Sequence, residues 1–226
     1  MENKEGYIVS VWKRPDWTSN DIIKYLKPFI RPLKVGHAGT LDPFAEGILV
    51  VCTGKMTKKV SSIMEMEKEY VVDIILGKRT DTLDSTGKIT AIKKCPSLNG
   101  KIIDKVLNQF IGEIDQIPPM FSALKHKGKR MYSLARKGIK IKQNPRKIII
   151  HNIELLSYKD NFMSIKVICG KGTYIRSLAR DIGHKLNTEG YVDSLVRSRV
   201  GSFDRLASIS AEDLKLWLQS QQHITN

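Results

Sequence analysis

Residues 35–53 read VGHAGTLDPFAEGILVVCT, and we expect the fold to be organised around this stretch. Its second half, residues 47–52, is a short apolar run rich in isoleucine, leucine and valine, which is typical of a buried strand. Its first half predicts neither a strand nor a helix. Two glycines bracket His37, and Pro43 disfavours the α region for Asp42. A carboxylate on such a loop can point into a cleft, where catalytic groups tend to lie. An aspartate before proline is also a common start of an ordinary turn.

Length and composition place the chain among globular proteins. Its 226 residues can bury a sizeable core, and 41% of them are hydrophobic while 27% are charged. No apolar run is long enough to span a membrane, and the N-terminal residues lack a signal-peptide pattern. The cysteines, Cys52, Cys95 and Cys169, lie far apart and predict neither disulfides nor a structural zinc site. We therefore expect a cytoplasmic protein.

The charge indicates a polyanionic partner. The formal net charge is +15 and the pI is near 9.7. Between Asp115 and Glu154 the sequence has no acidic residue, whereas ten residues are basic. These ten are Lys125, Lys127, Lys129, Arg130, Arg136, Lys137, Lys140, Lys142, Arg146 and Lys147. Such a block favours contact with a phosphate backbone, although a run of cations is often only a solvated surface.

Hydrophobic periodicity predicts alternating strands and helices. Strands are expected at residues 7–12, 47–52, 69–77, 147–156 and 162–169, the last two antiparallel and joined by a turn at 159–161. Helices are expected at residues 57–68, 99–111, 175–186 and 210–221, and after residue 18 with Ile22, Leu26, Phe29 and Ile30 on one face. Thr18 or Ser19 caps that helix. Asp81 and Asp84 are expected to cap a polar turn, and paired prolines exclude regular helix from residues 117–124.

The string GHAGTLDPFAEGILVVCTGKMTK, residues 36–58, closely resembles the signature of the bacterial tRNA pseudouridine synthase B family. Members of that family isomerise the uridine at position 55 in the TΨC arm of tRNA. The aspartate of the G-T-L-D-P core is their catalytic residue, and the resemblance assigns this role to Asp42.

Further motifs resemble the same family and imply roles for five more residues. The K-x-Y start of residues 68–77 implies that Tyr70 stacks on the target base. The K-G-T-Y-I-R motif at 171–176 implies that Arg176 pairs with the catalytic aspartate and that Tyr174 lines the pocket. The segment at 194–203 implies that Leu195 packs against the flipped base, and the G-H-x-G motif implies that His37 contacts displaced nucleotides. Without the resemblance, Tyr70 and His37 would be interpreted as ordinary structural residues. For Leu195, the sequence favours simple core packing nearly as much as a role in packing against the base.

Arg176 has a physical argument of its own. It lies in the first turn of its predicted helix, where a cation gains nothing from the helix dipole and needs another partner. A guanidinium beside Asp42 would keep that carboxylate ionised despite partial burial.

The basic block begins with residues 117–125, IPPMFSALK, which resemble the family's I/V-P-P-M-x-S-A-x-K segment. That segment leads into an insertion that grips the tRNA arm. The resemblance therefore implies that the insertion, at about residues 118–146, binds RNA through Lys125, Lys127, Lys129 and Arg130. The apolar and aromatic residues interleaved with these cations suit stacking on exposed bases, whereas the alternative is a surface hairpin.

One family motif is altered. The family's Lys-Pro-x-Gly-x-Thr-Ser motif corresponds to Arg14-Pro15-Asp16-Trp17-Thr18-Ser19, which lacks the glycine and is one residue shorter. Either Lys13 or Arg14 can therefore take the place of the family's lysine.

The sequence thus predicts an α/β (α+β) protein of the pseudouridine synthase fold, with a largely antiparallel mixed sheet flanked by helices. Residues 1–209 are expected to form the catalytic domain. Residues 210–226 are expected to form a helix and tail, without the separate C-terminal RNA-binding domain of many family members.

The predicted function is isomerisation of uridine 55 in tRNA, with Asp42 as nucleophile and with Tyr70 as the candidate acceptor of the C5 proton. We expect a monomer that binds tRNA and needs no cofactor, metal, membrane or protein partner. Whether Asp42 attacks the ribose or the base stays open. Two alternatives are a non-catalytic RNA-binding or tRNA-folding protein and a synthase that acts on another RNA.

Overall fold

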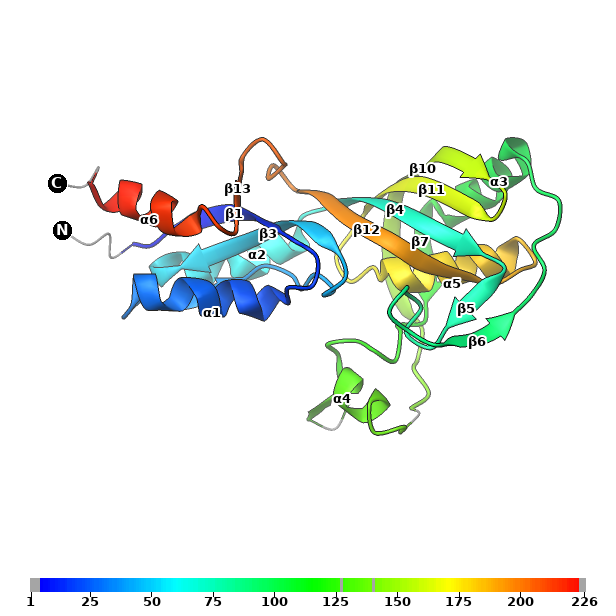
Figure 1. Cartoon of the computed structure of the whole chain (residues 1–226), viewed down its shortest axis with the longest axis horizontal. Coiled ribbons are helices and arrows are strands. Elements are labelled where there is room, and N and C mark those ends of the chain that lie inside the picture. Colours follow the sequence, from blue (N-terminus) through cyan, green and yellow to red (C-terminus); the bar gives the residue numbers. More distant parts are fainter. Residues whose placement is uncertain (1–4, 127, 140, 224–226) are drawn as a thin grey trace. The chain divides into compact units, whose positions relative to one another are not determined.

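The structure is a computed structural model that describes residues 5–126, 128–139 and 141–223 (Figure 1). The chain forms two compact units. Unit 1 takes in the chain up to Tyr70 and again from Val196, and unit 2 comprises residues 71–195. The chain passes from one unit to the other within strands β4 (Lys68–Leu76) and β12 (Gly190–Val200). Both units consist of a sheet with flanking helices, which confirms the predicted α/β class and mixed sheet.

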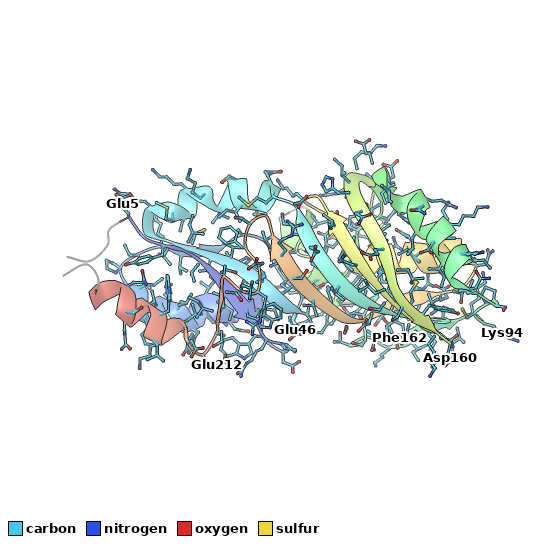
Figure 2. The ribbon with its side chains drawn as sticks, turned by 90° about the horizontal axis from the view of Figure 1, so that it is seen from above. Glu5, Glu46, Lys94, Asp160, Phe162 and Glu212 are labelled. Carbon is cyan, nitrogen blue, oxygen red and sulfur yellow. The ribbon has the colours of Figure 1, made fainter. Side chains whose placement is uncertain are left out.

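Unit 1 contains strands in the order β13 (Ser208–Ser210), β1 (Ile8–Lys13), β3 (Glu46–Thr53) and β12, with β2 (Val35–His37) also paired to β3. The pairings of β1 and β2 with β3 are antiparallel, whereas β13 pairs with β1, and β12 with β3, in parallel. Figure 2 labels Glu46, where β3 begins directly after the Asp42 loop. The predicted strands at 7–12 and 47–52 are therefore confirmed, each with slightly different ends.

Strand β3 is buried on both faces, which explains its uninterrupted apolar sequence. Leu49 and Val51 pack into a core with helices α1 (Ser19–Ile30) and α6 (Leu214–His223). Ile48 and Val50 point to the opposite face, where they pack with Ile63 of helix α2 (Val60–Glu65). Figure 2 shows α1 and α6 on one side of this sheet and α2 on the other. A strand between two hydrophobic layers cannot alternate polar and apolar residues.

Helix α1 begins where the sequence predicts. The Thr18 side chain accepts a hydrogen bond from the Asp21 amide, and the Asp21 carboxylate accepts one from the Thr18 amide, which completes a capping box. Ile22, Leu26 and Ile30 are buried as predicted. Phe29 lies at the edge of the same face, where it is 37% exposed and has the Lys215 ammonium over its ring.

Three other boundaries in unit 1 differ from the predictions. Strand β2 was not predicted, because Gly36 and the polar His37 give its three residues no strand pattern. These residues are extended through their pairing with β3. The expected helix at 57–68 is a 3₁₀ helix, η1 (Gly54–Lys59), followed by α2. Helix α6 begins at Leu214, although the hydroxyl of Ser210 does accept a hydrogen bond from the Asp213 amide. Leu214 and Leu218 pack into the core of unit 1.

Unit 2 contains strands in the order β12, β4, β11 (Phe162–Cys169), β10 (Arg146–Lys159) and β7 (Gly112–Gln116). Both β11 and β7 are antiparallel to β10. The turn between β10 and β11 passes through Asp160, which has a φ of +54° and is labelled with Phe162 in Figure 2. This confirms the predicted pair of strands, with β10 longer than expected. Strand β4 buries every second residue, so one face of this part of the sheet is core.

Helices and a hairpin complete unit 2. Asn99 caps helix α3 (Gly100–Leu107), which continues into the 3₁₀ helix η2 (Asn108–Phe110). Helix α5 (Ile175–Lys185) buries Ile175, Leu178 and Ile182, as the periodicity predicts. Strands β5 (Lys78–Thr80) and β6 (Ile89–Ile92) form a hairpin on either side of the polar turn.

The insertion leaves the sheet after β7 and returns at β10 (Figure 1). It carries the short strands β8 (Lys125–His126) and β9 (Lys129–Arg130) and helix α4 (Met131–Ala135). Its first residues are irregular, as the paired prolines predict. Met131 and Leu134 are buried, whereas Tyr132 is exposed and has the Arg136 guanidinium over its ring. Of the interleaved apolar and aromatic residues, Met131 and Leu134 are therefore not available for stacking on bases, whereas Tyr132 is.

None of the described helices is long and apolar enough to cross a membrane.

Candidate active site

The Asp42 loop lies in unit 1 and is fixed at several points. Strand β2 ends at His37, and the amide of Ala38 donates to the carbonyl of Val50 over 2.8 Å. The Ser19 hydroxyl binds both polar groups of the Leu41 backbone. It accepts a hydrogen bond from the Leu41 amide at 2.9 Å and donates one to the Leu41 carbonyl at 3.2 Å. Asp42 itself is half-buried. The backbone of the Asp42 loop is therefore held in place and lacks the freedom of a solvated turn.

Lys13, not Arg14, is the buried cation of the altered motif. Its side chain is completely buried, and its ammonium donates to the carbonyls of Arg14, Trp17 and Pro43 at 2.9, 2.7 and 3.2 Å. Arg14 is exposed and pairs with Glu212. The contact with Pro43 ties Lys13 to the residue that follows Asp42.

Burial lowers the pKa of Lys13 to about 8, although the attraction of Asp42 partly opposes this effect. At neutral pH Lys13 is therefore largely protonated and presents its positive charge near the Asp42 carboxylate.

Arg197 is a second buried cation, and the sequence analysis missed it. It lies in β12, is 1% exposed, and donates from Nε to the carbonyl of Ile48 at 2.7 Å. Its two terminal nitrogens donate to the carbonyls of Thr40 and Gly39 at 3.3 and 3.2 Å. One guanidinium thus binds both the start of β3 and the loop that leads to Asp42.

Gly47 explains how two cations come to lie at the start of β3. This glycine is the Cα partner of Lys13 in β1 and of Arg197 in β12. Its φ is +115°, and a Cβ there would lie 2.2 Å from the carbonyl oxygen of Arg197. Only glycine allows the β12 backbone to approach so closely. The glycine of the A-E-G-I-L segment was the one signal in the sequence that could have pointed to this junction.

His37 is half-buried at the end of β2. Burial lowers the pKa of its imidazole, and the positive charge of Arg197 lowers it further. The ring is therefore neutral at physiological pH, which suits a flat group that stacks on or replaces a base.

Tyr70 is 8% exposed and lies on the buried face of β4, where Lys68 and Val72 also point. It is the last residue of unit 1 before the chain enters unit 2. Unit 1 thus carries Asp42, His37 and Tyr70 of the predicted site residues, together with Lys13 and Arg197.

Unit 2 carries Arg176, which is held in a buried network. It is 5% exposed in the first turn of α5, and its Nη1 lies 3.4 Å from the Asp84 carboxylate. The guanidinium also donates to the carbonyls of Thr82 and Phe121 at 2.9 and 2.8 Å. The prediction that this cation needs partners other than the helix dipole is confirmed. Its expected pairing with Asp42, which belongs to the other unit, stays a prediction.

Asp84 does more than the predicted capping of a turn. Its Oδ1 accepts hydrogen bonds from the side chains of Thr82 and Thr86 at 2.7 and 2.6 Å and from the Thr86 amide at 3.1 Å. The same carboxylate, 4% exposed, faces Arg176. Asp81 shows the simpler behaviour, because its Oδ1 accepts from the Lys88 amide across the turn. The polar turn therefore fixes Arg176 through one of its two aspartates.

Tyr174 and Leu195 are the remaining predicted residues of unit 2. Tyr174 is half-buried at the N-cap of α5, where the side chain of Gln116 binds its backbone at both polar groups. Leu195 is 4% exposed in β12. Burial alone does not separate a role in base packing from a role in the core, so the role of Leu195 stays a prediction.

The basic residues of the insertion are only partly described. Lys127 lies outside the described residues, and Lys125, Lys129 and Arg130 lie in the short strands β8 and β9. Lys129 is exposed. The expectation of a block without counter-charge was wrong for Lys147, because its ammonium lies 3.5 Å from the Glu113 carboxylate and 3.4 Å from that of Asp115. These two carboxylates raise the pKa of Lys147.

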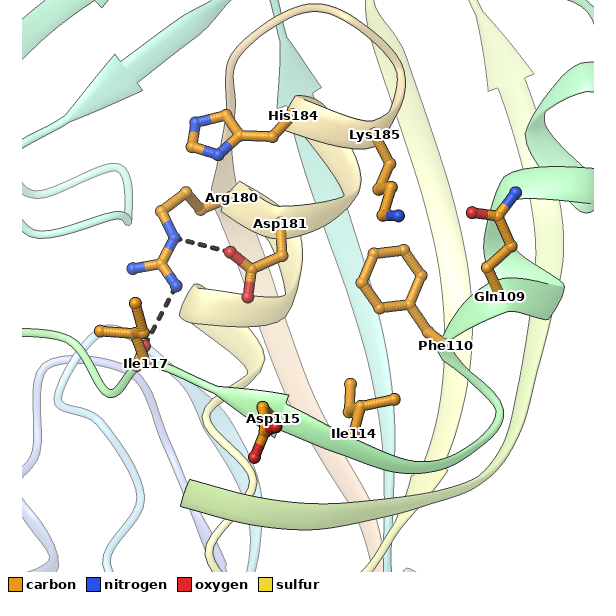
Figure 3. Close-up of a pocket in the computed structure, with 9 residues that line it drawn as sticks. All are labelled: Gln109, Phe110, Ile114, Asp115, Ile117, Arg180, Asp181, His184 and Lys185. Atoms are coloured by element: carbon orange, nitrogen blue, oxygen red, sulfur yellow. Dashed lines mark hydrogen bonds and ion pairs between the residues drawn. The ribbon is translucent and has the colours of Figure 1, made fainter. Parts of the chain in front are cut away.

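A hollow of about 470 Å³ lies in unit 2 between α5, η2 and β7 (Figure 3). None of the predicted site residues that the structure describes lines it. Arg180, on its wall, contacts the Asp181 carboxylate at 2.8 Å and donates to the Ile117 carbonyl at 3.1 Å. The described residues contain no cluster of histidine, cysteine and acidic side chains that could hold a metal ion.

The chain is similar to known proteins in sequence and in structure. Residues 27–175 match the TruB family pseudouridylate synthase (N terminal domain). The chain is 43% identical over 209 residues to the tRNA pseudouridine synthase B of Caldanaerobacter subterraneus subsp. tengcongensis, covering 92% of this chain and 73% of the relative. It is 40% identical over 228 residues to the protein of the same name from Phocaeicola vulgatus, covering 98% and 97%.

Among solved structures, the chain is similar to one in the crystal structure of a Cbf5-Nop10-Gar1 complex. The TM-score is 0.75 and the identity 27%, and the match covers 99% of this chain and 57% of that chain.

Proposed function

The chain belongs to the TruB family of pseudouridylate synthases, and from this premise we propose that it converts uridine 55 in the TΨC loop of tRNA to pseudouridine, with Asp42 as nucleophile. Family membership makes the chain an isomerase. The relatives' name supports tRNA as the substrate, and the net charge of +15 supports a polyanion. The position in the tRNA and the roles of individual residues are part of the proposal.

One observation carries the proposal for Asp42. Its loop is bound by two fully buried cations, Lys13 through Pro43 and Arg197 through Gly39 and Thr40. Burying two cations is costly, and their hydrogen bonds go to backbone carbonyls on both sides of Asp42. The result is a loop whose backbone is held on both sides of the carboxylate, with the positive charge of Lys13 near it. These are the properties that a nucleophilic carboxylate needs.

The chemistry requires a carboxylate and no outside reagent. The C1′–N1 bond of uridine breaks, the base turns, and a C1′–C5 bond forms. C5 then loses a proton and N1 gains one, so no other molecule is consumed. Asp42 holds one fragment covalently while the base turns, by attack on either the ribose or the base.

Five further residues are assigned to the proposed reaction site. Tyr70 stacks on the base and is the candidate acceptor of the C5 proton. Arg176, held by Asp84, supplies the positive charge that faces the reacting groups. Tyr174 and Leu195 line the pocket around the flipped base. A flipped base must leave its stack, and the neutral ring of His37 occupies the space it vacates.

RNA binding is assigned to the insertion. Lys125, Lys127, Lys129 and Arg130 contact phosphates, and the exposed ring of Tyr132 offers a stacking face. We further propose that the protein acts as a monomer in the cytoplasm, without a protein partner or cofactor.

The test uses unmodified tRNA transcripts. The protein is incubated with the transcript, and pseudouridine is mapped by carbodiimide labelling and primer extension. We expect modification at position 55, none on a transcript with cytidine at that position, and none with the Asp42→Asn variant, which still binds tRNA. Modification at another position or only in another RNA would refute the assigned substrate. An Asp42→Asn variant with the parent's rate would refute the nucleophile.

A further inference from the structure

The first residues of the insertion are bound directly to the helix that carries Arg176. Gln116 is the last residue of β7 and pairs with Arg146 of β10, so these two residues form the rung at which the insertion begins and ends. Immediately after this rung, the carbonyl of Ile117 accepts hydrogen bonds from Ser177 at 2.8 Å and from Arg180 at 3.1 Å. Figure 3 shows the Arg180 contact on the wall of the hollow. The Phe121 carbonyl, four residues on, accepts from Arg176.

Gln116 makes the most specific of these contacts. Its Oε1 accepts from the amide of Tyr174 at 2.8 Å, and its Nε2 donates to the carbonyl of Tyr174 at 3.1 Å. The side chain is 2% exposed. The side-chain amide of Gln116 thus makes hydrogen bonds to both the backbone N–H and the backbone carbonyl of Tyr174. Two such bonds to one residue fix its position and its orientation, because both must be satisfied at once.

Tyr174 needs such a partner. It is the N-cap of α5, and its own side chain does not cap the helix. Its carbonyl accepts the first helical bond from the Leu178 amide at 3.0 Å, and Gln116 adds a second donor to the same oxygen. Helix N-termini without a side-chain cap leave donors to be satisfied elsewhere. Arg176 is the second residue of this helix, so the position of the Tyr174 backbone sets the position from which the Arg176 side chain extends.

We propose that Gln116 is a positioning residue for the reaction, which holds the N-terminus of α5 so that Tyr174 and Arg176 meet the substrate correctly and links that geometry to the base of the RNA-binding insertion. The inference rests on the proposed roles of Tyr174 and Arg176. Gln116 touches neither the substrate nor the reacting atoms. Its contribution is therefore to the rate after tRNA has bound, and not to the affinity for tRNA.

The first test compares two variants at this junction. Gln116→Met keeps the length of the side chain but removes both hydrogen bonds to Tyr174. Ser177→Ala removes one buried hydrogen bond to Ile117, whose carbonyl still has Arg180 as a donor. Single-turnover rates are measured on saturating tRNA below the melting temperature of each variant, together with the dissociation constant for tRNA.

We expect Gln116→Met to slow the single-turnover rate by about 10- to 100-fold, because small displacements of catalytic groups have effects of this size. Its dissociation constant for tRNA should stay within about threefold of the parent's, since no RNA contact is removed. Ser177→Ala should react at nearly the parent's rate. An unchanged rate for Gln116→Met, or equal losses for both variants, would overturn the proposal.

A second variant separates positioning from simple packing. In Gln116→Glu, a protonated carboxylic acid can accept from the Tyr174 amide and donate to its carbonyl, as the amide does, whereas the ionised form can only accept. Burial raises the pKa of such a carboxyl group. The rate of Gln116→Glu relative to the parent should therefore rise as the pH is lowered from about 8 to about 5.5. A ratio that does not change with pH would overturn the proposal even if Gln116→Met does not fold.

The parent protein distinguishes this inference from the proposed function. If the parent forms no pseudouridine in tRNA, the proposed function has failed. If the parent is active and the Gln116 variants match it, only the positioning role has failed.

Discussion

Lys13 is expected to make the protein more stable as the pH rises above about 8. Its folded-state pKa is about 8, whereas the ordinary value is 10.5, a difference of 10.5 − 8, or about 2.5 units. The unfolded chain therefore binds this proton more tightly than the folded protein does. Between the two pKa values the unfolded state holds more protons, so the free energy of unfolding increases with pH. The full effect is about 3.4 kcal/mol, of which about 1.4 kcal/mol is gained between pH 7 and pH 9.

The assay is urea denaturation of the parent and of Lys13→Met at pH 7, 8 and 9. Methionine keeps an unbranched apolar chain but carries no titratable group. The free energy of unfolding of the parent should rise by about 1.4 kcal/mol relative to that of Lys13→Met over this interval. Lys27→Met removes an exposed lysine from α1 in the same unit and controls for the loss of one cation. Parallel pH dependence of the parent and Lys13→Met would refute the description of Lys13 as a buried, weakened base.

The same titration should appear in catalysis with the opposite sign. Above pH 8 the neutral amine of Lys13 no longer presents a positive charge to Asp42 and has two N–H groups for three carbonyls. The single-turnover rate on tRNA should therefore fall above about pH 8 while the fold becomes more stable. A rate that is constant to pH 9 would show that the charge of Lys13 does not support the reaction.

Three further predictions concern Arg176, the insertion and His37. Arg176→Lys keeps the charge but cannot reproduce the planar fork of the guanidinium. The free energy of unfolding should therefore fall by about 1–3 kcal/mol, and the single-turnover rate, measured well below the melting temperature, should fall at least tenfold. A rate equal to the parent's would show that Arg176 is only structural. Replacing the exposed Lys129 and Lys137 with alanine should reduce the slope of log affinity for tRNA against log salt by roughly one unit each. Lys147→Ala should reduce the same slope less, because that cation is already paired with two carboxylates. Equal reductions of the slope by Lys147→Ala and by each of the other two substitutions would refute this prediction. His37→Ala should slow the reaction on folded tRNA more than on an unstructured oligonucleotide of the same loop sequence, since only the folded substrate requires base extrusion. Equal losses of rate on both substrates would show that His37 does not assist base extrusion.

The sequence predicted best the features that depend on neighbours along the chain. The helix cap at Thr18 or Ser19 and the apolar face of α5 were predicted from local patterns, and the structure confirms both, with Thr18 as the cap. The continuous apolar run of β3 predicted a buried strand, because a strand covered on both faces has no polar side. Strand β2 could not be predicted in the same way, since its three residues are extended only through their hydrogen bonds to β3.

The candidate site shows the same division. The G-T-L-D-P core and the K-G-T-Y-I-R motif pointed to Asp42 and Arg176 through resemblance. Arg197 stayed hidden because it reaches the Asp42 loop from a strand about 155 residues further along the chain, and no local pattern reports such a contact. Gln116 was missed for the same reason, since its partner Tyr174 is 58 positions away.

Energetics offers a way to find such residues once a fold is known. Among the residues whose burial the structure describes, Lys13 and Arg197 are the two largest charged side chains that are fully buried, and each donates hydrogen bonds to backbone carbonyls. Removing a charge from water costs several kcal/mol, and a well-packed apolar residue often serves stability as well or better. A chain selected for stability alone would not need two such cations on either side of Gly47. Their presence is explained if the loop they hold must place one carboxylate accurately, which supports the proposed role of Asp42 independently of the motif in which it lies.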